Sequence, residues 1–415
     1  MAVVRQFRAL RPAKGKEKDI ASVPYDVVNT NEARVLAEGN PRSFLHVVRP
    51  EIDLPDSVDI YDDSVYDKAV ENLDRLIKNN ELIQEESPSL YLYKLTIGEH
   101  EQTGVVCCCS ADDYDNDVIK KHEYTRKEKE DDRLRHMLAL SAHAGPVLMT
   151  YRGDERINKI VTQETAKPPL YDFVAEDGVG HTVWRVKQPG PLVDAFREVP
   201  SLYIADGHHR AAGGSRVKKE MESRGLAFTG AEEWGYFLAV LFPAEELAIL
   251  PYNRWISDTG EYTANGFMER LKKSFDVDAV KDPEPKKKGT FNMYIGGRWY
   301  QLILKNKAGE DSQESSPISA VGKLDLSVFQ REVLEPVLGI LDQRKDRRID
   351  FVGGEDSTKK LEKLVDEEKG VAFSFFPVSI EELLSVSDAG LVMPPKSTWF
   401  EPKLRSGIVV KTLDE

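Results

Sequence analysis

The residues best suited to chemistry lie in one segment, ADGHHRAAGGS, which covers residues 205–215. A short apolar run before it predicts a strand that ends at Asp206, and Gly207 permits a tight turn into a long helix. The free N–H groups and the dipole of a helix start attract anions. Arg210 adds a planar guanidinium that suits phosphate oxygens. The segment therefore predicts a phosphate-binding turn formed by Gly207, His208, His209 and Arg210.

Two other interpretations of this segment stay open. It could be an ordinary surface helix that Asp206 caps at its N-terminus. It could also hold a metal, since Asp206, His208 and His209 are possible zinc ligands and a metal-dependent hydrolase would use the two histidines. Adjacent histidines point away from each other on a helix, so a single ion could not easily take both of them.

A second segment, KHE at residues 121–123, carries a candidate general base. Glu123 lies beside a lysine and a histidine, and its carboxylate could accept a proton from a substrate hydroxyl. No second histidine follows at the spacing of a zinc protease. The alternative is that the whole charged stretch forms a solvated face.

A third segment, PPKSTWF at residues 394–400, could bind a small anion. Its prolines favour an extended loop, and Lys396 with the hydroxyls of Ser397 and Thr398 suits a phosphate or a carboxylate. The segment lacks the glycine pattern of a P-loop. A structural strap across the domain is the alternative interpretation.

Three weaker candidates are explained as readily by local structure. Asp26 and Glu51 each lie beside a proline turn, where turn chemistry accounts for a carboxylate. They are the alternatives to Glu123 as a base, together with Asp206. The segment LPYNRW, residues 250–255, could supply an aromatic ring and an arginine to a ligand.

The elements that position these residues alternate helices and strands without an internal repeat. Helical spacing of apolar residues predicts helices over residues 31–38, 61–82, a stretch ending at 142, 191–197, a stretch ending at 224, 265–275, 326–338 and 358–368. Strands are predicted over residues 3–10, 44–48, 89–97, 103–110, 146–151, 170–175, 181–186, 201–205, 235–242, 246–255, 290–304 (a hairpin) and 371–377. This pattern predicts an α+β fold with mixed, largely antiparallel sheets.

Composition limits the class of protein. The 415 residues include 57 basic and 71 acidic ones, and the net charge of -14 argues against a surface that binds nucleic acid throughout. The contiguous Cys107, Cys108 and Cys109 have no disulfide or zinc spacing and fit a buried strand. Neither a signal-peptide pattern at the N-terminus nor an apolar run of membrane-spanning length is found. We therefore expect a cytoplasmic protein, with a polar disordered loop at residues 306–316.

The DGHHR turn resembles the ATP-binding turn of the ParB/sulfiredoxin superfamily, and most closely that of the free-serine kinases. All three segments appear in the order found in those kinases, at residues 121–123, 206–210 and 395–398. The whole chain also resembles a large prokaryotic family catalogued as a domain of unknown function. Its PYDV, KHE…DR, DGHHR and closing KSTWFEPKLRSG motifs are all found here. The resemblance implies a ParB/sulfiredoxin-like nucleotide-binding core over residues 113–415 and an N-terminal region, 1–112, of unknown role.

The resemblance also implies an activity, the phosphorylation of free L-serine to O-phosphoserine by ATP or ADP with Mg²⁺. Glu123 would be the general base, and Asp206 and His208 would also be catalytic. Asp206 would in addition be a ligand of Mg²⁺. The nucleotide phosphates would bind to Gly207, His208, His209 and Arg210, and the serine would bind to His122, Lys396, Ser397 and Thr398. A nucleotide-binding regulator of the ParB type is the alternative, but its DNA-reading helix should be basic, and no clear basic recognition helix is found.

Overall fold

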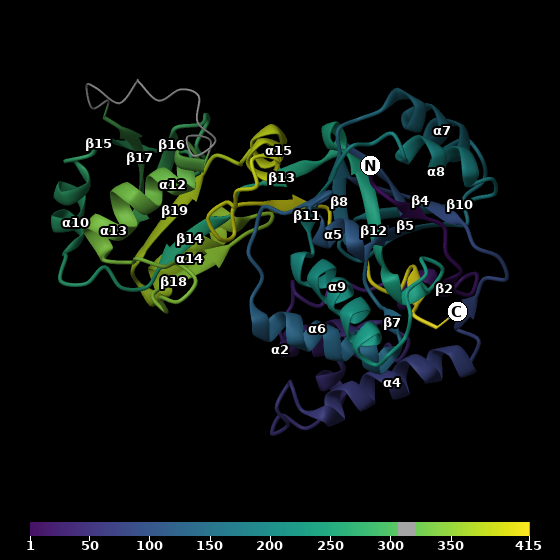
Figure 1. The fold of residues 1–415 in the computed structure, drawn as a ribbon. Coiled ribbons are helices and arrows are strands. Elements are labelled where there is room, and N and C mark those ends of the chain that lie inside the picture. Colours follow the sequence, from purple (N-terminus) through teal and green to yellow (C-terminus); the bar gives the residue numbers. More distant parts are fainter. Residues whose placement is uncertain (306–320, 415) are drawn as a thin grey trace. The chain divides into compact units, whose positions relative to one another are not determined.

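The computed structural model describes residues 1–305 and 321–414. Contacts divide the chain into two compact units (Figure 1). Unit 1 comprises Met1–Lys121, Thr125–Leu247 and Pro402–Glu415, and unit 2 comprises His122–Tyr124 and Ala248–Glu401. The residues on both sides of the predicted division at 112 lie in unit 1, and a separate role for residues 1–112 stays a prediction. The loop predicted at 306–316 lies outside the described residues.

The main sheet of unit 1 has nine strands among the described residues. Its order is β6 (Ile119–Lys120), β11 (Leu202–Asp206), β8 (Val147–Tyr151), β12 (Tyr236–Pro243), β5 (His100–Ser110), β4 (Leu90–Ile97), β10 (Gly180–Val186) and β9 (Tyr171–Val174), with β1 (Val4–Arg5) beside β5. Two pairs, β6 with β11 and β8 with β12, are parallel, and the others are antiparallel. The prediction of mixed, largely antiparallel sheets is confirmed.

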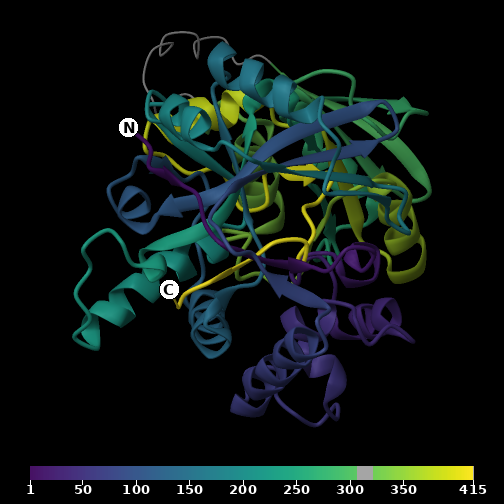
Figure 2. The ribbon, with the colours of Figure 1, turned by 90° about the vertical axis from the view of Figure 1, so that its right-hand side faces the viewer.

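A smaller sheet in unit 1 pairs a strand near the N-terminus with a strand near the C-terminus. Its order is β3 (Leu82–Gln84), β2 (Ala9–Pro12), β21 (Val410–Thr412) and β7 (Ala142–His143). Figure 2 shows the yellow C-terminal segment beside the purple N-terminal one, where Ala9 pairs with Lys411.

Helices cover the sheets of unit 1. They are α1 (Glu17–Ile20), α2 (Thr30–Ala37), α3 (Leu45–Val48), α4 (Asp63–Lys78), α5 (Ala111–Asp115), α6 (Lys127–Leu140), α7 (Glu155–Thr165), α8 (Gly190–Phe196) and α9 (His208–Ser223), with short 3₁₀ turns at Pro50–Asp53, Glu233–Gly235 and Ala244–Glu246. Cys107 and Cys109 belong to the core between the main sheet and these helices, and all three cysteines are fully buried. The predicted buried strand is therefore confirmed.

Unit 2 is built on a six-stranded antiparallel sheet. Its order is β15 (Phe275–Val280), β17 (Arg298–Leu304), β16 (Thr290–Ile295), β19 (Val371–Phe375), β14 (Asn253–Ile256) and β18 (Ile349–Val352), and β13 (Ala248–Leu250) pairs separately with β20 (Trp399–Glu401). The helical segments are α10 (Ala264–Leu271), α12 (Asp325–Phe329), a π-helical turn (Gln330–Leu334), α13 (Glu335–Leu338), α14 (Ser357–Glu368) and α15 (Ile380–Asp388). Phe291 and Met293 face one core and Tyr294 faces another with Leu361 of α14, as the alternation of a strand requires.

Six predicted elements differ from the structure. The helix predicted at 61–82 ends early, at Lys78, with Leu82 in strand β3, and the helix predicted to end at 142 ends at Leu140, with Ala142 in strand β7. The strand predicted at 44–48 is the single helical turn α3, because one turn followed by Pro50 is too short for apolar spacing to separate a helix from a strand. The strand predicted at 246–255 is divided at Pro251 into β13 and β14, which belong to different sheets. The helix predicted at 265–275 ends at Leu271, and the strand predicted at 3–10 is interrupted between β1 and β2.

Within the described part of the chain, every helix is too short or too polar to cross a membrane.

Candidate functional site

The turn at residues 206–210 has the predicted strand–turn–helix geometry. Strand β11 ends at Asp206, and Gly207 adopts φ of 93°, a left-handed conformation that favours glycine. Helix α9 then begins at His208 and runs for 16 residues. Gly207 is the residue that precedes the helix, and no side chain caps the helix start. The alternative in which Asp206 caps α9 is therefore wrong; its Oδ1 accepts a hydrogen bond from the adjacent Gly207 N–H (2.8 Å).

The Arg210 guanidinium folds back over this turn and is buried. A Cβ atom on Gly207 would lie 3.1 Å from Arg210 Nε, so the glycine also makes room for the side chain. Arg210 Nη1 donates to the Pro146 carbonyl, and Nη2 lies 3.7 Å from Asp26 Oδ2. Its Nε finds no hydrogen-bond acceptor among the described residues. Since an unpaired buried donor costs about 1–3 kcal/mol, this turn is suited to an anion that supplies the missing acceptor.

A small cavity beside Arg210 gathers residues from distant parts of the sequence. It has a volume of about 20 Å³ and is lined by, among others, Tyr25, Arg133, Gly145 and Ser406. The Arg133 guanidinium stacks on the Tyr25 ring at 3.8 Å from its centre. A Cβ atom on Gly145 would lie 3.1 Å from Ser406 Oγ. The guanidinium groups of Arg210 and Arg133, the Tyr25 phenol and the Ser406 hydroxyl thus surround one space. Arg133 adds a second positive charge beside the turn.

The sequence motifs contain these cavity residues, but sequence reasoning gave them no role. Tyr25 belongs to PYDV, Arg133 to the DR that follows KHE, and Ser406 to the closing RSG. Asp26, an alternative base, is the ion-pair partner of Arg210. Glu51, the other alternative, is buried with its Oε1 2.9 Å from Arg49 Nε. The only signal in the sequence was that each of these residues belongs to a motif. The motifs are separated by many residues along the chain, so their spacing does not indicate that they meet.

The electrostatics of the cavity favour charged arginine and neutral histidine. Burial opposes the charge on Arg133, but the nearby Tyr25 and Asp132 outweigh it and raise the pKa of the guanidinium. Burial, together with the charge of Arg133, lowers the pKa of His136 to about 4. His136 Nε2 donates to the Val47 carbonyl (2.9 Å), which fixes the neutral ring.

The depressed pKa of His136 predicts acid sensitivity. The unfolded chain takes up this proton near pH 6.5, whereas the folded protein takes it up near pH 4. Between these values the unfolded state binds more protons, so stability is full above pH 6.5 and is lost as the pH falls toward 4. We expect thermal unfolding midpoints to fall over this range, with a smaller fall in His136→Gln, since one proton is worth about 1.4 kcal/mol per pH unit. Identical pH profiles of the two proteins would contradict the assignment.

The other polar residues of the turn have partners of their own. Asp206 Oδ2 lies 3.2 Å from Lys403 Nζ. His209 Nε2 accepts the Arg126 N–H (3.1 Å), so its ring proton is on Nδ1, and His208 is buried. The described residues contain no group of three or more histidine, cysteine, aspartate or glutamate side chains that could hold a metal. Asp206 is a single carboxylate already paired with a lysine, so its role toward Mg²⁺ stays a prediction.

The other predicted site residues gather in unit 2. His122 is buried, and its Nε2 lies 3.3 Å from Thr398 Oγ1. Its carbonyl accepts the Met393 N–H (2.8 Å). The segment around residue 122 and the loop at 394–398 therefore lie side by side within this unit. Ser397 Oγ donates to the Pro394 carbonyl (2.6 Å), so this hydroxyl helps to form the loop itself.

Arg254 positions the loop at 394–398 through hydrogen bonds to its backbone. It is fully buried and donates to the carbonyls of Pro395 (2.7 Å) and Lys396 (3.0 Å). Burial lowers its pKa to about 9, an effect that Tyr252 and Glu123 partly oppose. Lys396 itself has φ of 56° and places its Nζ 5.4 Å from the centre of the Tyr252 ring. The sequence suggested that Arg254 could bind a ligand. In the structure its guanidinium donates hydrogen bonds to backbone carbonyls of the loop instead.

Fold and geometry together define a mixed α/β protein of two units, with a positively charged glycine turn at the start of a long helix in unit 1. A family model described as "Protein of unknown function (DUF1015)" matches residues 4–327. The chain belongs to this family, which confirms the resemblance to a domain of unknown function. No protein with a curated description matches the chain.

Three solved structures show the range of distant likeness. A conserved hypothetical protein from Pyrococcus furiosus is 15% identical, with 74% of this chain and 95% of that chain covered and a TM-score of 0.36. A free serine kinase in complex with AMP is 14% identical, with coverage of 74% and 91% and a TM-score of 0.34. SbnI from Staphylococcus aureus, with a C-terminal truncation, is 11% identical, with coverage of 74% and 87% and a TM-score of 0.36. Likeness at this level carries no argument about the chemistry of this chain.

Proposed function

We propose that this protein is a nucleotide-dependent kinase that phosphorylates the hydroxyl of free L-serine. The observation that carries the proposal is the buried Arg210, which folds over a glycine turn at an uncapped helix start with its Nε unpaired. A terminal phosphate of ATP or ADP would supply oxygen acceptors to Arg210 Nε and to the first N–H groups of α9. Arg133 and Ser406 would add a second cation and a hydroxyl nearby.

The acceptor side of the reaction is assigned to Glu123, Lys396, and His122 with Thr398. The Glu123 carboxylate would take the proton from the serine hydroxyl as its oxygen bonds to phosphorus and the bond from phosphorus to the departing nucleotide breaks. Lys396 would bind the serine carboxylate, and His122 with Thr398 would orient the amino acid. Such a reaction depends mostly on positioning and electrostatics, and the bonds from Arg254 to the loop carbonyls support that positioning.

Asp206 and His208 are proposed to act at the nucleotide side. Mg²⁺, when bound with a nucleotide, neutralises the charge of the phosphates. Such an ion usually takes one or two protein carboxylates together with phosphates and water, and Asp206 is the carboxylate that this turn offers. Its pairing with Lys403 supports a positioning role for the aspartate within the turn.

The decisive experiment is incubation of the protein with ATP or ADP, Mg²⁺ and one hydroxy amino acid at a time. Phosphorus NMR and mass spectrometry would detect O-phosphoserine and the shortened nucleotide. We expect serine to be phosphorylated in preference to threonine and homoserine. Nucleotide binding without any phosphorylated amino acid would contradict the kinase and would favour a regulator of the ParB type.

Lys396→Ala is expected to raise KM for serine at least about tenfold and to leave KM for the nucleotide unchanged. The reason is that a charge-assisted hydrogen bond to the amino acid carboxylate is worth about 1.5–3 kcal/mol, and the nucleotide is assigned to the turn at residues 206–210. Steady-state kinetics with each substrate varied in turn would measure both values. Lys363→Ala, on the exposed face of α14, is the matched control and should change neither value. Equal changes in both KM values would return the loop at 394–398 to a structural role.

A further inference from the structure

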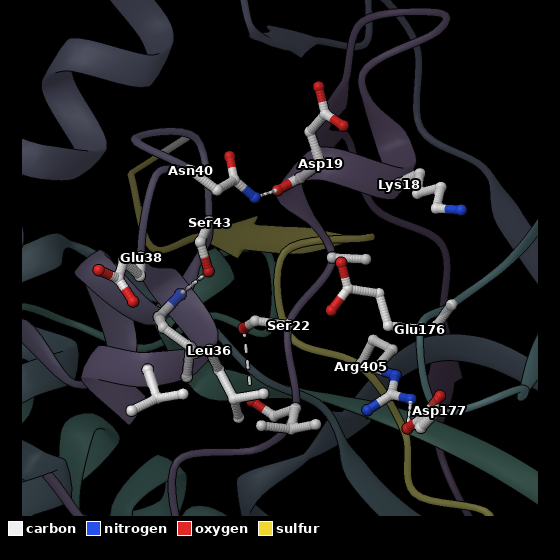
Figure 3. Close-up of a pocket in the computed structure, with 15 residues that line it drawn as sticks. Lys18, Asp19, Ser22, Leu36, Glu38, Asn40, Ser43, Glu176, Asp177 and Arg405 are labelled. Carbon is white, nitrogen blue, oxygen red and sulfur yellow. Dashed lines mark hydrogen bonds and ion pairs between the residues drawn. The ribbon is translucent and has the colours of Figure 1, made fainter. Parts of the chain in front are cut away.

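A second cavity in unit 1 shares no residue with the cavity beside Arg210. Its volume is about 400 Å³, within the range of small-molecule sites. Figure 3 shows that its walls come from residues 18–45 on one side and from the β9–β10 turn and Arg405 on the other. The proposed kinase reaction uses none of its side chains.

Arg405 lies at the base of this cavity and is 5% exposed. Its Nη2 donates to the Asp177 carboxylate, and its Nε donates to His181 Nε2 (3.2 Å). Burial and the charge of Arg405 lower the pKa of His181 to about 3, so the ring is neutral and its Nδ1–H donates to Tyr93 Oη (2.8 Å). Arg405 Nη1 makes no hydrogen bond with the residues that the structure describes. A firmly held guanidinium thus keeps free donors at the cavity wall.

Other polar groups of the cavity complement this arginine. In Figure 3 the Glu176 carboxylate points toward the space between the two walls, and the hydroxyls of Ser22 and Ser43 lie on the opposite wall, each joined by a dashed line to the backbone. Glu176 has no hydrogen-bond or ion-pair partner among the described residues. Ser22 Oγ donates to the Val23 carbonyl (3.3 Å), which leaves it able to accept. Ser43 Oγ accepts the Leu45 N–H (3.3 Å), which leaves it able to donate.

The charges and apolar groups of the lining limit the class of ligand. Four carboxylates and two cations line the cavity: Asp19, Glu38, Glu176, Asp177, Lys18 and Arg405. This acidic excess disfavours a simple anion, while the buried guanidinium disfavours a simple cation. Val35 and Leu36 are strongly exposed aliphatic residues of the same lining, and they offer an apolar surface to a ligand.

We propose that this cavity binds a free α-amino acid with an aliphatic side chain, as its zwitterion. The ligand carboxylate accepts from Arg405 Nη1 and the Ser43 hydroxyl, and its ammonium group donates to Glu176 and Ser22. The side chain packs against Val35 and Leu36. The ligand carboxylate thus meets Arg405 Nη1, the ligand ammonium group meets the Glu176 carboxylate, and neither protein group has another hydrogen-bond partner in the part of the chain that the structure describes. A few polar groups placed in this way usually orient the ligand in a small-molecule site.

Calorimetric titration of the full chain, without nucleotide, with L-leucine, L-valine, L-alanine and L-serine tests the proposal. We expect an aliphatic amino acid to bind more tightly than serine. For leucine, 3-methylbutylamine lacks the carboxylate and 4-methylpentanoate lacks the ammonium group, and each should bind at least about tenfold more weakly. Failure of all three aliphatic amino acids to bind would overturn the proposal.

Variants of the exposed Glu176 and of its half-buried neighbour Ala175 assign the binding to this cavity without disturbing Arg405. Glu176→Gln should weaken binding at least about tenfold, and Ala175→Trp should abolish it by filling the cavity. Glu99→Gln, in the exposed β4–β5 turn, is the matched control and should bind like the wild type. Binding that persists in both cavity variants would overturn the assignment. So would binding that is lost in Lys396→Ala, because the amino acid would then occupy the acceptor site of the proposed kinase.

Discussion

Replacement of Glu123 by glutamine is expected to lower kcat for serine phosphorylation at least about a hundredfold, because a general base contributes about 10²–10⁴-fold. Glutamine keeps the size of the side chain and removes its capacity to accept a proton. Glu123 follows His122, whose ring lies 3.3 Å from Thr398 Oγ1 in unit 2. The nucleotide is assigned to the turn at residues 206–210, so its dissociation constant should stay unchanged. Single-turnover kinetics and calorimetric titration measure the two quantities separately.

Glu128→Gln is the matched control for this prediction. Glu128 lies in the same charged run, is exposed on α6 and should retain full activity. If Glu123→Gln is as fast as the wild type, Glu123 belongs to a solvated face and the base lies elsewhere. Asp26 would then be the first alternative, since it is partly exposed beside Arg210, whereas Glu51 is buried against Arg49.

Local sequence patterns predicted most of the individual elements. The helix at α4 and the hairpin β4–β5 follow from clear apolar periods over many residues. The turn at 206–210 followed from one glycine between an apolar strand and a helix. The short turn α3 failed because four residues hold less than two periods of either structure. Elements of this length are decided by tertiary packing, which a local pattern does not contain.

The residues that surround the candidate site could not be predicted from the sequence and became evident only in the folded structure. Tyr25, Arg133 and Ser406 reach the cavity beside Arg210 from a loop, a helix and the C-terminal segment. Nothing in the spacing of these residues along the chain indicates that they meet. The unpaired Nε of Arg210 is also a property of packing, because it depends on which acceptors surround the guanidinium. Motif chemistry leads to the proposal of a phosphate ligand, and only the packed structure shows the second guanidinium, that of Arg133, and the unpaired Nε of Arg210.

Arg210→Ala is expected to weaken ATP or ADP binding about ten- to a hundredfold. A charge-assisted bond to phosphate is worth about 1.5–3 kcal/mol, and each 1.4 kcal/mol is a factor of ten in the dissociation constant. Arg210→Lys should recover part of the loss, since lysine keeps the charge without the planar fork. Arg224→Ala, at the exposed end of α9, is the matched control and should bind like the wild type.

Gly207→Ala tests the same turn without removing its charge. A Cβ atom there would lie 3.1 Å from Arg210 Nε, and φ of 93° is unfavourable for alanine, so the guanidinium should be displaced. Circular dichroism and thermal unfolding would identify a variant that has lost its fold rather than its site. In a folded Gly207→Ala or Arg210→Ala protein, an unchanged nucleotide dissociation constant would contradict the phosphate turn, and with it the proposed kinase. A weakened constant in both, with Arg224→Ala unaffected, would place the phosphates on this turn, because the two variants change different atoms that meet at Arg210 Nε.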